Sequence, residues 1–147
     1  MSLKSRIQDD VKNAMRAHER ERLAVLRLVT AAIKQKEVDE RIELDDAQVL
    51  AVLDKMVKQR RESLEQYRAA GRDDLADREA FELDLIQTYL PEPLSESELN
   101  DLIDEAMAQA GATSIKDMGK VMAVLKPGLQ GRADMGAVSA MIKARLD

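Results

Sequence analysis

Residues 57–90 read VKQRRESLEQYRAAGRDDLADREAFELDLIQTYL, and this stretch decides the fold. Apolar residues recur at helical spacing on both sides of Gly71, and the glycine itself is typical of a helix C-terminus. Folding the chain back at Gly71 brings Tyr67 opposite Leu75 and Met56 opposite Ile86. The pattern therefore predicts a long antiparallel helical hairpin.

The two apolar stripes of this hairpin contain charged residues. Arg60 interrupts the first stripe, and Glu79 and Glu82 interrupt the second. The register about Gly71 places Arg60 opposite Glu82. Because a buried arginine is tolerable beside a carboxylate and costly alone, we expect a partly buried Arg60–Glu82 ion pair with an architectural role. Glu79 is the alternative acceptor if the turn shifts the register.

The composition favours an all-α protein. Good helix formers dominate the 147 residues, and extended β-branched runs are missing. The chain has no cysteine, which excludes disulfides and thiolate metal sites. No segment approaches the roughly 20 apolar residues of a membrane span, so we expect a soluble, cytoplasmic protein with no membrane partner.

Pro91 and Pro93 mark the expected boundary between an N-terminal domain, residues 1–90, and a C-terminal domain, residues 91–147. The N-terminal domain should start with a helical region that reaches about residue 36 and continue into the hairpin. This first region has an apolar stripe of Leu3, Ile7, Val11 and Met15, and a cationic edge of Arg20, Arg27 and Lys34 at intervals of seven residues.

The C-terminal domain should hold three helices. Their expected starts and stops are a Ser95–Glu98 capping box, Gly111, a start at Thr113 or Ser114, a stop at Pro127, and a cap at Asp134 for a last helix to about Leu146. Methionines in these helices fit core packing better than a cofactor box.

Catalytic chemistry has no support in the sequence. His18 is the single histidine and lies in a highly charged stretch, which favours a solvated helix residue over a metal ligand. The segment after Gly111 resembles a P-loop only superficially, because seven residues separate Gly111 from Gly119 where four are required. Val121 also replaces the hydroxyl residue that would hold magnesium. We expect no catalytic residue, no metal and no cofactor.

The stretch KPGLQGRADMG, residues 126–136, is rich in glycine and follows the acidic segment 91–115. Residues 116–147 carry six Lys or Arg against three acids. Exposed N–H groups around Gly128 and Gly131, together with the N-terminus of the last helix, would form an anion site, with Lys120, Lys126 and Arg132 nearby. The alternative is a tight interhelical turn in which Asp134 caps a helix.

Residues 57–99, which extend the opening stretch through PEPLSESEL, resemble the YqeY family of small bacterial proteins, and so do ATSIKDMGKVMAVLKPGLQGRADMGAVS and ERERLAVLRLVTAAIK. The last segment is similar to the tail of GatB, a subunit of the aspartyl/glutamyl-tRNA amidotransferase, at Val121–Met122 and Gly131–Ala133. Pro127 and Gly128 depart from the more polar linker of that tail. The resemblance implies a two-domain helical protein with a GatB-tail-like C-terminal domain that contacts tRNA. The implied RNA-binding residues are Lys116, Lys120, Lys126, Gly128, Gly131, Arg132 and Lys143.

Three hypotheses follow for the function. The first is a non-catalytic module that binds tRNA or associates with a tRNA amidotransferase or an aminoacyl-tRNA-related protein. The second is a helical protein–protein adaptor without an RNA role. The third, an independent amidotransferase, is the weakest, because the catalytic body of GatB has no counterpart in 147 residues. The resemblance also suggests carbon–nitrogen ligase activity with glutamine as amido donor. We expect this activity to belong to the larger amidotransferase and not to the isolated chain.

Overall fold

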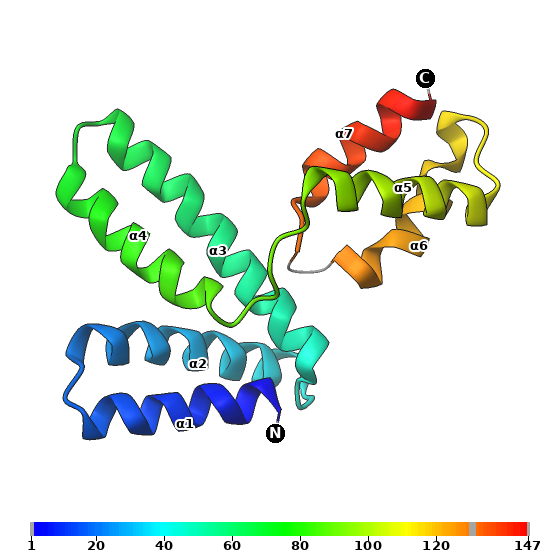
Figure 1. Cartoon of the computed structure of the whole chain (residues 1–147). Coiled ribbons are helices and arrows are strands. Elements are labelled where there is room, and N and C mark those ends of the chain that lie inside the picture. The colour runs from blue at the N-terminus through cyan, green and yellow to red at the C-terminus, as the bar shows by residue number, and fades with distance from the viewer. Residues whose placement is uncertain (1, 130–131, 147) are drawn as a thin grey trace. The chain divides into compact units, whose positions relative to one another are not determined.

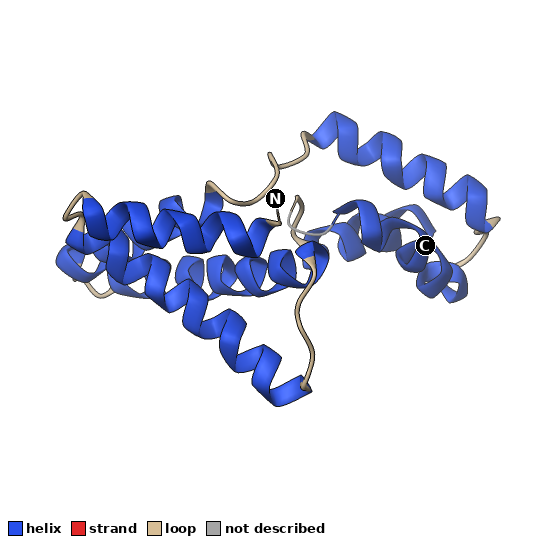
Figure 2. Ribbon diagram, turned by 90° about the horizontal axis from the view of Figure 1, so that it is seen from below, coloured by secondary structure: helices blue, strands red, loops and turns tan. Residues whose placement is uncertain are grey.

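The computed structural model describes residues 2–129 and 132–146, and within them every regular element is helical (Figures 1 and 2). The chain separates into two compact units, Met1–Leu90 and Pro91–Asp147. The first unit contains α1 (Leu3–Arg16), α2 (Arg20–Glu40), α3 (Asp46–Ala69) and α4 (Asp73–Gln87). The second contains α5 (Glu96–Ala110), the short 3₁₀ helix η1 (Ile115–Asp117), α6 (Met118–Leu129) and α7 (Met135–Leu146). The all-α fold class is confirmed.

Helices α3 and α4 form the antiparallel hairpin around Gly71 (Figure 1). The first of them begins at a capping box, in which the Asp45 carboxylate accepts from the Gln48 N–H and the Gln48 side chain accepts from the Asp45 N–H. This arrangement satisfies two backbone donors that a helix start leaves without partners. Gly71 has a φ of +72°, a left-handed conformation that explains why the turn needs a glycine.

Helices α1 and α2 form a second antiparallel pair in the same unit (Figure 1). The helical region extends to Glu40, beyond the predicted end near residue 36. His18 is not a helix residue as predicted: it lies in the turn between the two helices, with a φ of +58°. Nothing in the sequence marks this turn, because neither glycine nor proline is present. Met15, expected on the apolar stripe, is 46% exposed.

One hydrophobic core joins the four helices of the first unit. Its fully buried side chains include Ile7 from α1, Leu26 and Val29 from α2, Val49 and Leu53 from α3, and Ile86 from α4. Tyr89 closes this core after the end of α4, where its hydroxyl donates to the Asp10 carboxylate over 2.5 Å. The Arg6 guanidinium lies 5.1 Å from the centre of the Tyr89 ring, which fixes α1 against the end of α4.

The second unit has its own core, centred on Ile103, Val121, Leu125, Leu129 and Ile142. Its first helix begins at the predicted position, since the Ser95 hydroxyl accepts from the Glu98 N–H over 3.1 Å. The helix ends at Gly111, which has a φ of +63°.

Pro127 does not end α6, contrary to the prediction. The helix continues through the proline to Leu129, whose side chain is fully buried. A proline in the last turn removes one backbone hydrogen bond and crowds the preceding turn, and the burial of Leu129 is the stabilisation that opposes this cost.

Candidate nucleic-acid interface

All four lysines of the second unit are exposed. Lys116 lies in η1, Lys120 and Lys126 on α6, and Lys143 on α7. They flank the apolar positions of these helices, which face the core, so the core itself orients the lysines toward solvent. These lysines are four of the six cations that the sequence places after residue 115.

The lysines of α6 do not form one continuous stripe. Lys120 and Lys126 are six residues apart, which separates them by about 120° around the helix axis. Lys120 lies 3.9 Å from the Asp117 carboxylate, an ion pair with an exposed lysine that contributes little to stability. The N–H groups of Thr113 and Ser114 donate to the same carboxylate and lower the pKa of Asp117, so Asp117 primarily caps the helix.

Arg132 has a structural role in the second unit. Its Nε donates to the Glu92 carbonyl over 3.2 Å, and its own carbonyl accepts from the Leu94 N–H over 2.9 Å. These bonds hold the segment before α5 against the segment before α7. The other arginine, Arg145, bonds to Asp104 and to the Asn100 side chain, and so ties α7 to α5. Both arginines of this unit thus make internal contacts, whereas its lysines face solvent.

The glycine-rich turn differs from the expectation. Gly128 is inside α6 rather than in a loop, and a Cβ there would meet no atom within 4 Å. Gly131 lies outside the described residues. A glycine in a helix has its N–H groups aligned with the helix axis, so Gly128 does not form the expected concave set of backbone donors.

The N-terminus of α7 already has an anionic partner. The Asp134 carboxylate accepts from the Gly136 N–H over 3.1 Å, and the Asp134 carbonyl accepts from the Val138 N–H. A carboxylate at this position satisfies the helix start and opposes a phosphate by like charge. The alternative interpretation of the turn, with Asp134 as a helix cap, therefore fits the geometry, and the expected anion site at this helix end does not.

The predicted ion pair of the hairpin is present in the structure. Arg60 Nε and Glu82 Oε2 are 3.1 Å apart, and the two side chains are only 14% and 13% exposed. A second guanidinium nitrogen of Arg60 donates to the Met56 carbonyl over 3.2 Å. Glu82 rather than Glu79 is thus the acceptor, and the pair joins α3 to α4.

A groove between α1 and α2 was not predicted. It encloses about 450 Å³ and is lined by Lys4, Gln8, Arg27, Thr30, Ala31, Ile33, Lys34 and Glu37. The sequence offered one signal, the repeat of Arg27 and Lys34, but pairing α1 with α2 was needed to bring Lys4 beside them.

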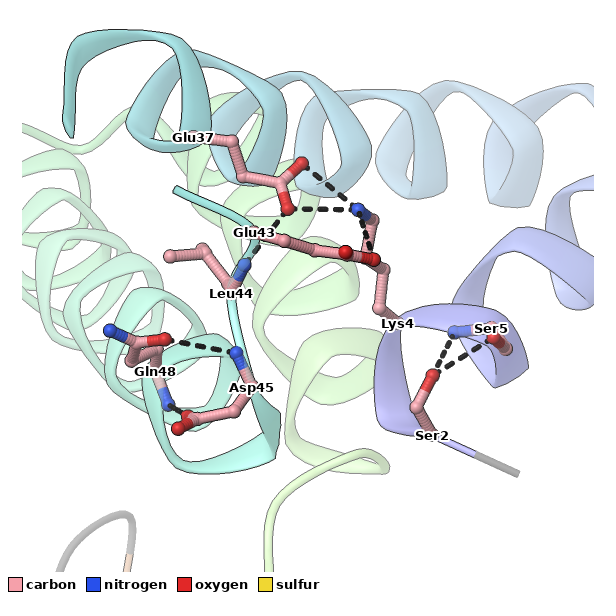
Figure 3. Close-up of polar contacts among 8 residues, drawn as sticks. All are labelled: Ser2, Lys4, Ser5, Glu37, Glu43, Leu44, Asp45 and Gln48. Carbon is pink, nitrogen blue, oxygen red and sulfur yellow. Dashed lines mark hydrogen bonds and ion pairs between the residues drawn. The ribbon is translucent and has the colours of Figure 1, made fainter. Parts of the chain in front are cut away.

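Glu37 lines this groove and bonds to residues of two other segments (Figure 3). Lys4 Nζ lies 2.8 Å from its carboxylate, and the Leu44 N–H donates to the same group over 2.9 Å. The hydrogen bond from Lys4, followed by that from Leu44, lowers the pKa of Glu37 below its ordinary value of 4.5. Glu37 therefore fixes α1 and the α2–α3 connection to each other.

Metal-ligating side chains are dispersed over residues 2–129 and 132–146. Three or more metal-ligating side chains do not gather anywhere in this part of the chain. The phenol of Tyr89 has a raised pKa, first because it is buried and then because it bonds to Asp10, so it stays protonated and serves as a donor. None of these helices combines the length and the apolar character needed to cross a membrane.

Comparison with known proteins identifies relatives of the chain. The family described as Yqey-like protein matches residues 4–146. A curated relative from Pyrenophora tritici-repentis, named Altered inheritance of mitochondria protein 41, mitochondrial, is 30% identical over 130 residues, which cover 87% of this chain and 71% of the relative. The protein of that name from Lachancea thermotolerans is 29% identical over 147 residues, covering 95% and 76%. The one from Eremothecium gossypii is 39% identical over 85 residues, covering 57% and 46%.

These comparisons correct one expectation and limit another. The names of the relatives state a mitochondrial location, so the expected cytoplasmic localisation is wrong, and the matched organisms are eukaryotes rather than bacteria. Neither the family description nor these names mention tRNA or an amidotransferase. The match over nearly the whole length is nevertheless decisive for the family, and the chain belongs to the Yqey-like proteins.

Proposed function

We infer that the chain is a non-catalytic tRNA-binding module, whose C-terminal unit is a GatB-tail-like domain that approaches RNA through its lysines. The observation that carries the proposal is a difference between the arginines and the lysines of this unit. Its arginines make internal bonds, and Lys116, Lys120, Lys126 and Lys143 extend into solvent. Lysine binds phosphate as a point charge and needs no fixed geometry.

The mode of binding is electrostatic. The three aromatic residues, Tyr67, Phe81 and Tyr89, all belong to the first unit, so the second unit has no ring on which an RNA base can stack. The lysines are also spread around more than one helix face. Contacts of this kind recognise the phosphate backbone and its shape, with little dependence on base sequence.

The test is tRNA binding by the whole chain, measured by fluorescence anisotropy at low salt. A variant with all four lysines changed to glutamate should lose at least about tenfold in affinity, because each phosphate contact is converted from attraction to repulsion. The matched control changes the same number of exposed cations in the first unit: Lys12, Lys55, Lys58 and Arg61 to glutamate. Circular dichroism verifies that both variants are folded.

Equal losses in both variants would show that net charge alone governs binding and would overturn the assignment of the site. No binding by the unmodified chain would overturn the function itself. The assay includes mitochondrial tRNAs, because the names of the relatives refer to mitochondria. A parallel incubation with ATP, glutamine and charged tRNA should yield no amidated product if the chain is non-catalytic.

A further inference from the structure

An exposed line of residues runs along α2, and we call it the α2 seam. It consists of three cations, Arg20, Arg27 and Lys34, and three short or apolar residues, Ala24, Ala31 and Val38. The cations and the small residues alternate at intervals of four and three. Six such residues share one face of the helix, and all six are exposed. Val38 is 59% exposed, although it is a large apolar residue.

The described part of the first unit does not cover this seam. The core of the unit takes the opposite side of α2, where Val25, Leu26, Val29 and Ile33 are buried. Helix α1 lies along one flank of α2 (Figure 1). Three seam residues, Arg27, Ala31 and Lys34, also line the groove between the two helices. The seam is therefore an outward face of a helix that is otherwise packed.

Two acids that border the seam bond to residues outside it, and one of them, Glu37, also attracts Lys34 electrostatically. Glu37 is bound by Lys4 and the Leu44 N–H, and Glu19 pairs with Arg22 over 3.4 Å. The Arg27 guanidinium makes a weak contact with the Met15 sulfur at 3.6 Å. The seam thus presents positive charge, with no carboxylate in its own line to balance it.

The spacing of the seam matches a second helix. Alternating intervals of four and three residues are the heptad pattern by which two helices remain in contact, and successive cations are about 10.5 Å apart. Alanine between the cations allows another helix backbone to approach closely. A nucleic-acid strand carries a charge about every 3.4 Å and would select neither the heptad interval nor the small residues. A lipid surface would call for several large apolar or aromatic side chains, and the seam holds a single one, Val38.

We propose that the α2 seam docks an acidic helix of another protein. The partner helix would carry a carboxylate every seven residues, opposite Arg20, Arg27 and Lys34. Small or apolar residues would lie between its carboxylates and pack against Ala24, Ala31 and Val38. The complementary charges set the partner and its register, and the packed line provides the contact area.

The experiment uses the whole chain and a labelled synthetic helical peptide of about three heptads, with glutamate at each position that faces a cation and leucine or alanine between. A peptide of the same composition in scrambled order is the reference. The chain should bind the heptad peptide at least about tenfold more tightly than the scrambled one. Changing Arg27 and Lys34 to glutamate should abolish that preference. The same change at Lys58 and Arg61, two exposed cations of α3, should preserve it.

A second variant separates helix docking from simple attraction of anions. Ala24→Gln with Ala31→Gln fills the seam and leaves every charge in place. It should weaken binding of the heptad peptide by about tenfold and leave binding of tRNA unchanged.

Equal binding of the two peptides, or binding of neither, would overturn the proposal. A second result would also overturn it. In that result, changing Arg27 and Lys34 to glutamate abolishes binding of tRNA or of anionic phospholipid vesicles, but the chain still prefers the heptad peptide. Because the seam variants leave the lysines of the second unit intact, failure here is distinguishable from failure of the proposed tRNA binding.

Discussion

The Arg60–Glu82 pair makes a quantitative prediction about the hairpin. The change Glu82→Leu should destabilise the first unit, because it leaves the Arg60 guanidinium largely covered and without its carboxylate. Replacing both partners, as Arg60→Met with Glu82→Leu, should restore most of the stability. The reason is that both charges then vanish together, and apolar side chains of similar size take their place in the stripe.

The structure sets the magnitude. Breaking a fully buried pair costs about 3–5 kcal/mol, and an exposed pair contributes about 0–1 kcal/mol. With side chains 14% and 13% exposed and an N–O distance of 3.1 Å, the hairpin pair lies nearer the buried limit. We expect a loss of about 2–3 kcal/mol for Glu82→Leu and a double variant within about 1 kcal/mol of the original protein.

Urea unfolding followed by tyrosine fluorescence measures this directly. Both tyrosines, Tyr67 and Tyr89, belong to the first unit, so their signal reports that unit even if the second unfolds separately. A control Arg78→Met removes an exposed arginine 4.0 Å from Glu82 and should change the free energy of unfolding by less than about 0.5 kcal/mol. The reasoning is refuted if Glu82→Leu is as stable as the control, or if the double variant loses the sum of the two single changes.

Three further predictions concern other contacts of the two units. Glu37→Gln should lower the urea midpoint at neutral pH, and the difference from the original protein should shrink as the pH falls below about 4.5. A carboxyl whose pKa is lowered on folding stabilises fully above the unfolded pKa and loses this stabilisation as the pH falls through the folded pKa. A pH-independent difference would contradict the role of the Lys4 bond. Tyr89→Phe should cost about 1–2 kcal/mol by loss of its hydrogen bond to a carboxylate. In a near-ultraviolet absorbance titration, the same change should also remove the phenol that ionises above the ordinary pKa of 10.0. If that ionisation step persists in Tyr89→Phe, its assignment to Tyr89 is wrong. This raised pKa stabilises fully below the unfolded value and is lost as the pH rises through the folded one. Gly128→Ala should raise the free energy of unfolding of the second unit by up to about 1 kcal/mol, and its thermal midpoint with it. Gly111→Ala should lower this free energy by about 1 kcal/mol, because Gly111 has a positive φ. Thermal unfolding followed by circular dichroism measures both changes. Destabilisation by Gly128→Ala would contradict the position of Gly128 within α6.

The hairpin was predictable because its information is local. Gly71 fixes the turn, and the helical period on either side fixes which residues meet, so the contact between Arg60 and Glu82 follows from spacing alone. The same holds for Ser95, whose hydroxyl lies three residues before the N–H that it accepts from.

Other features depend on packing that no local pattern encodes. The left-handed turn at His18 carries no glycine, and α6 continues through Pro127 because Leu129 is needed in the core. The groove beside α2 required Lys4 to meet Glu37 across 33 positions of the chain. The glycine-rich turn misled the prediction for the same reason: whether a glycine ends a helix or lies within it is decided by what the following residues bury.

The most direct test of the proposed function is the salt dependence of tRNA binding. For the unmodified chain, the logarithm of the binding constant should fall with the logarithm of salt concentration with a slope of about −3, as expected for four lysines at phosphates. For the variant with Lys116, Lys120, Lys126 and Lys143 changed to glutamate, the slope should approach zero. A slope that is unchanged in this variant would place the RNA contacts elsewhere, and the absence of any salt-sensitive binding would contradict the tRNA function.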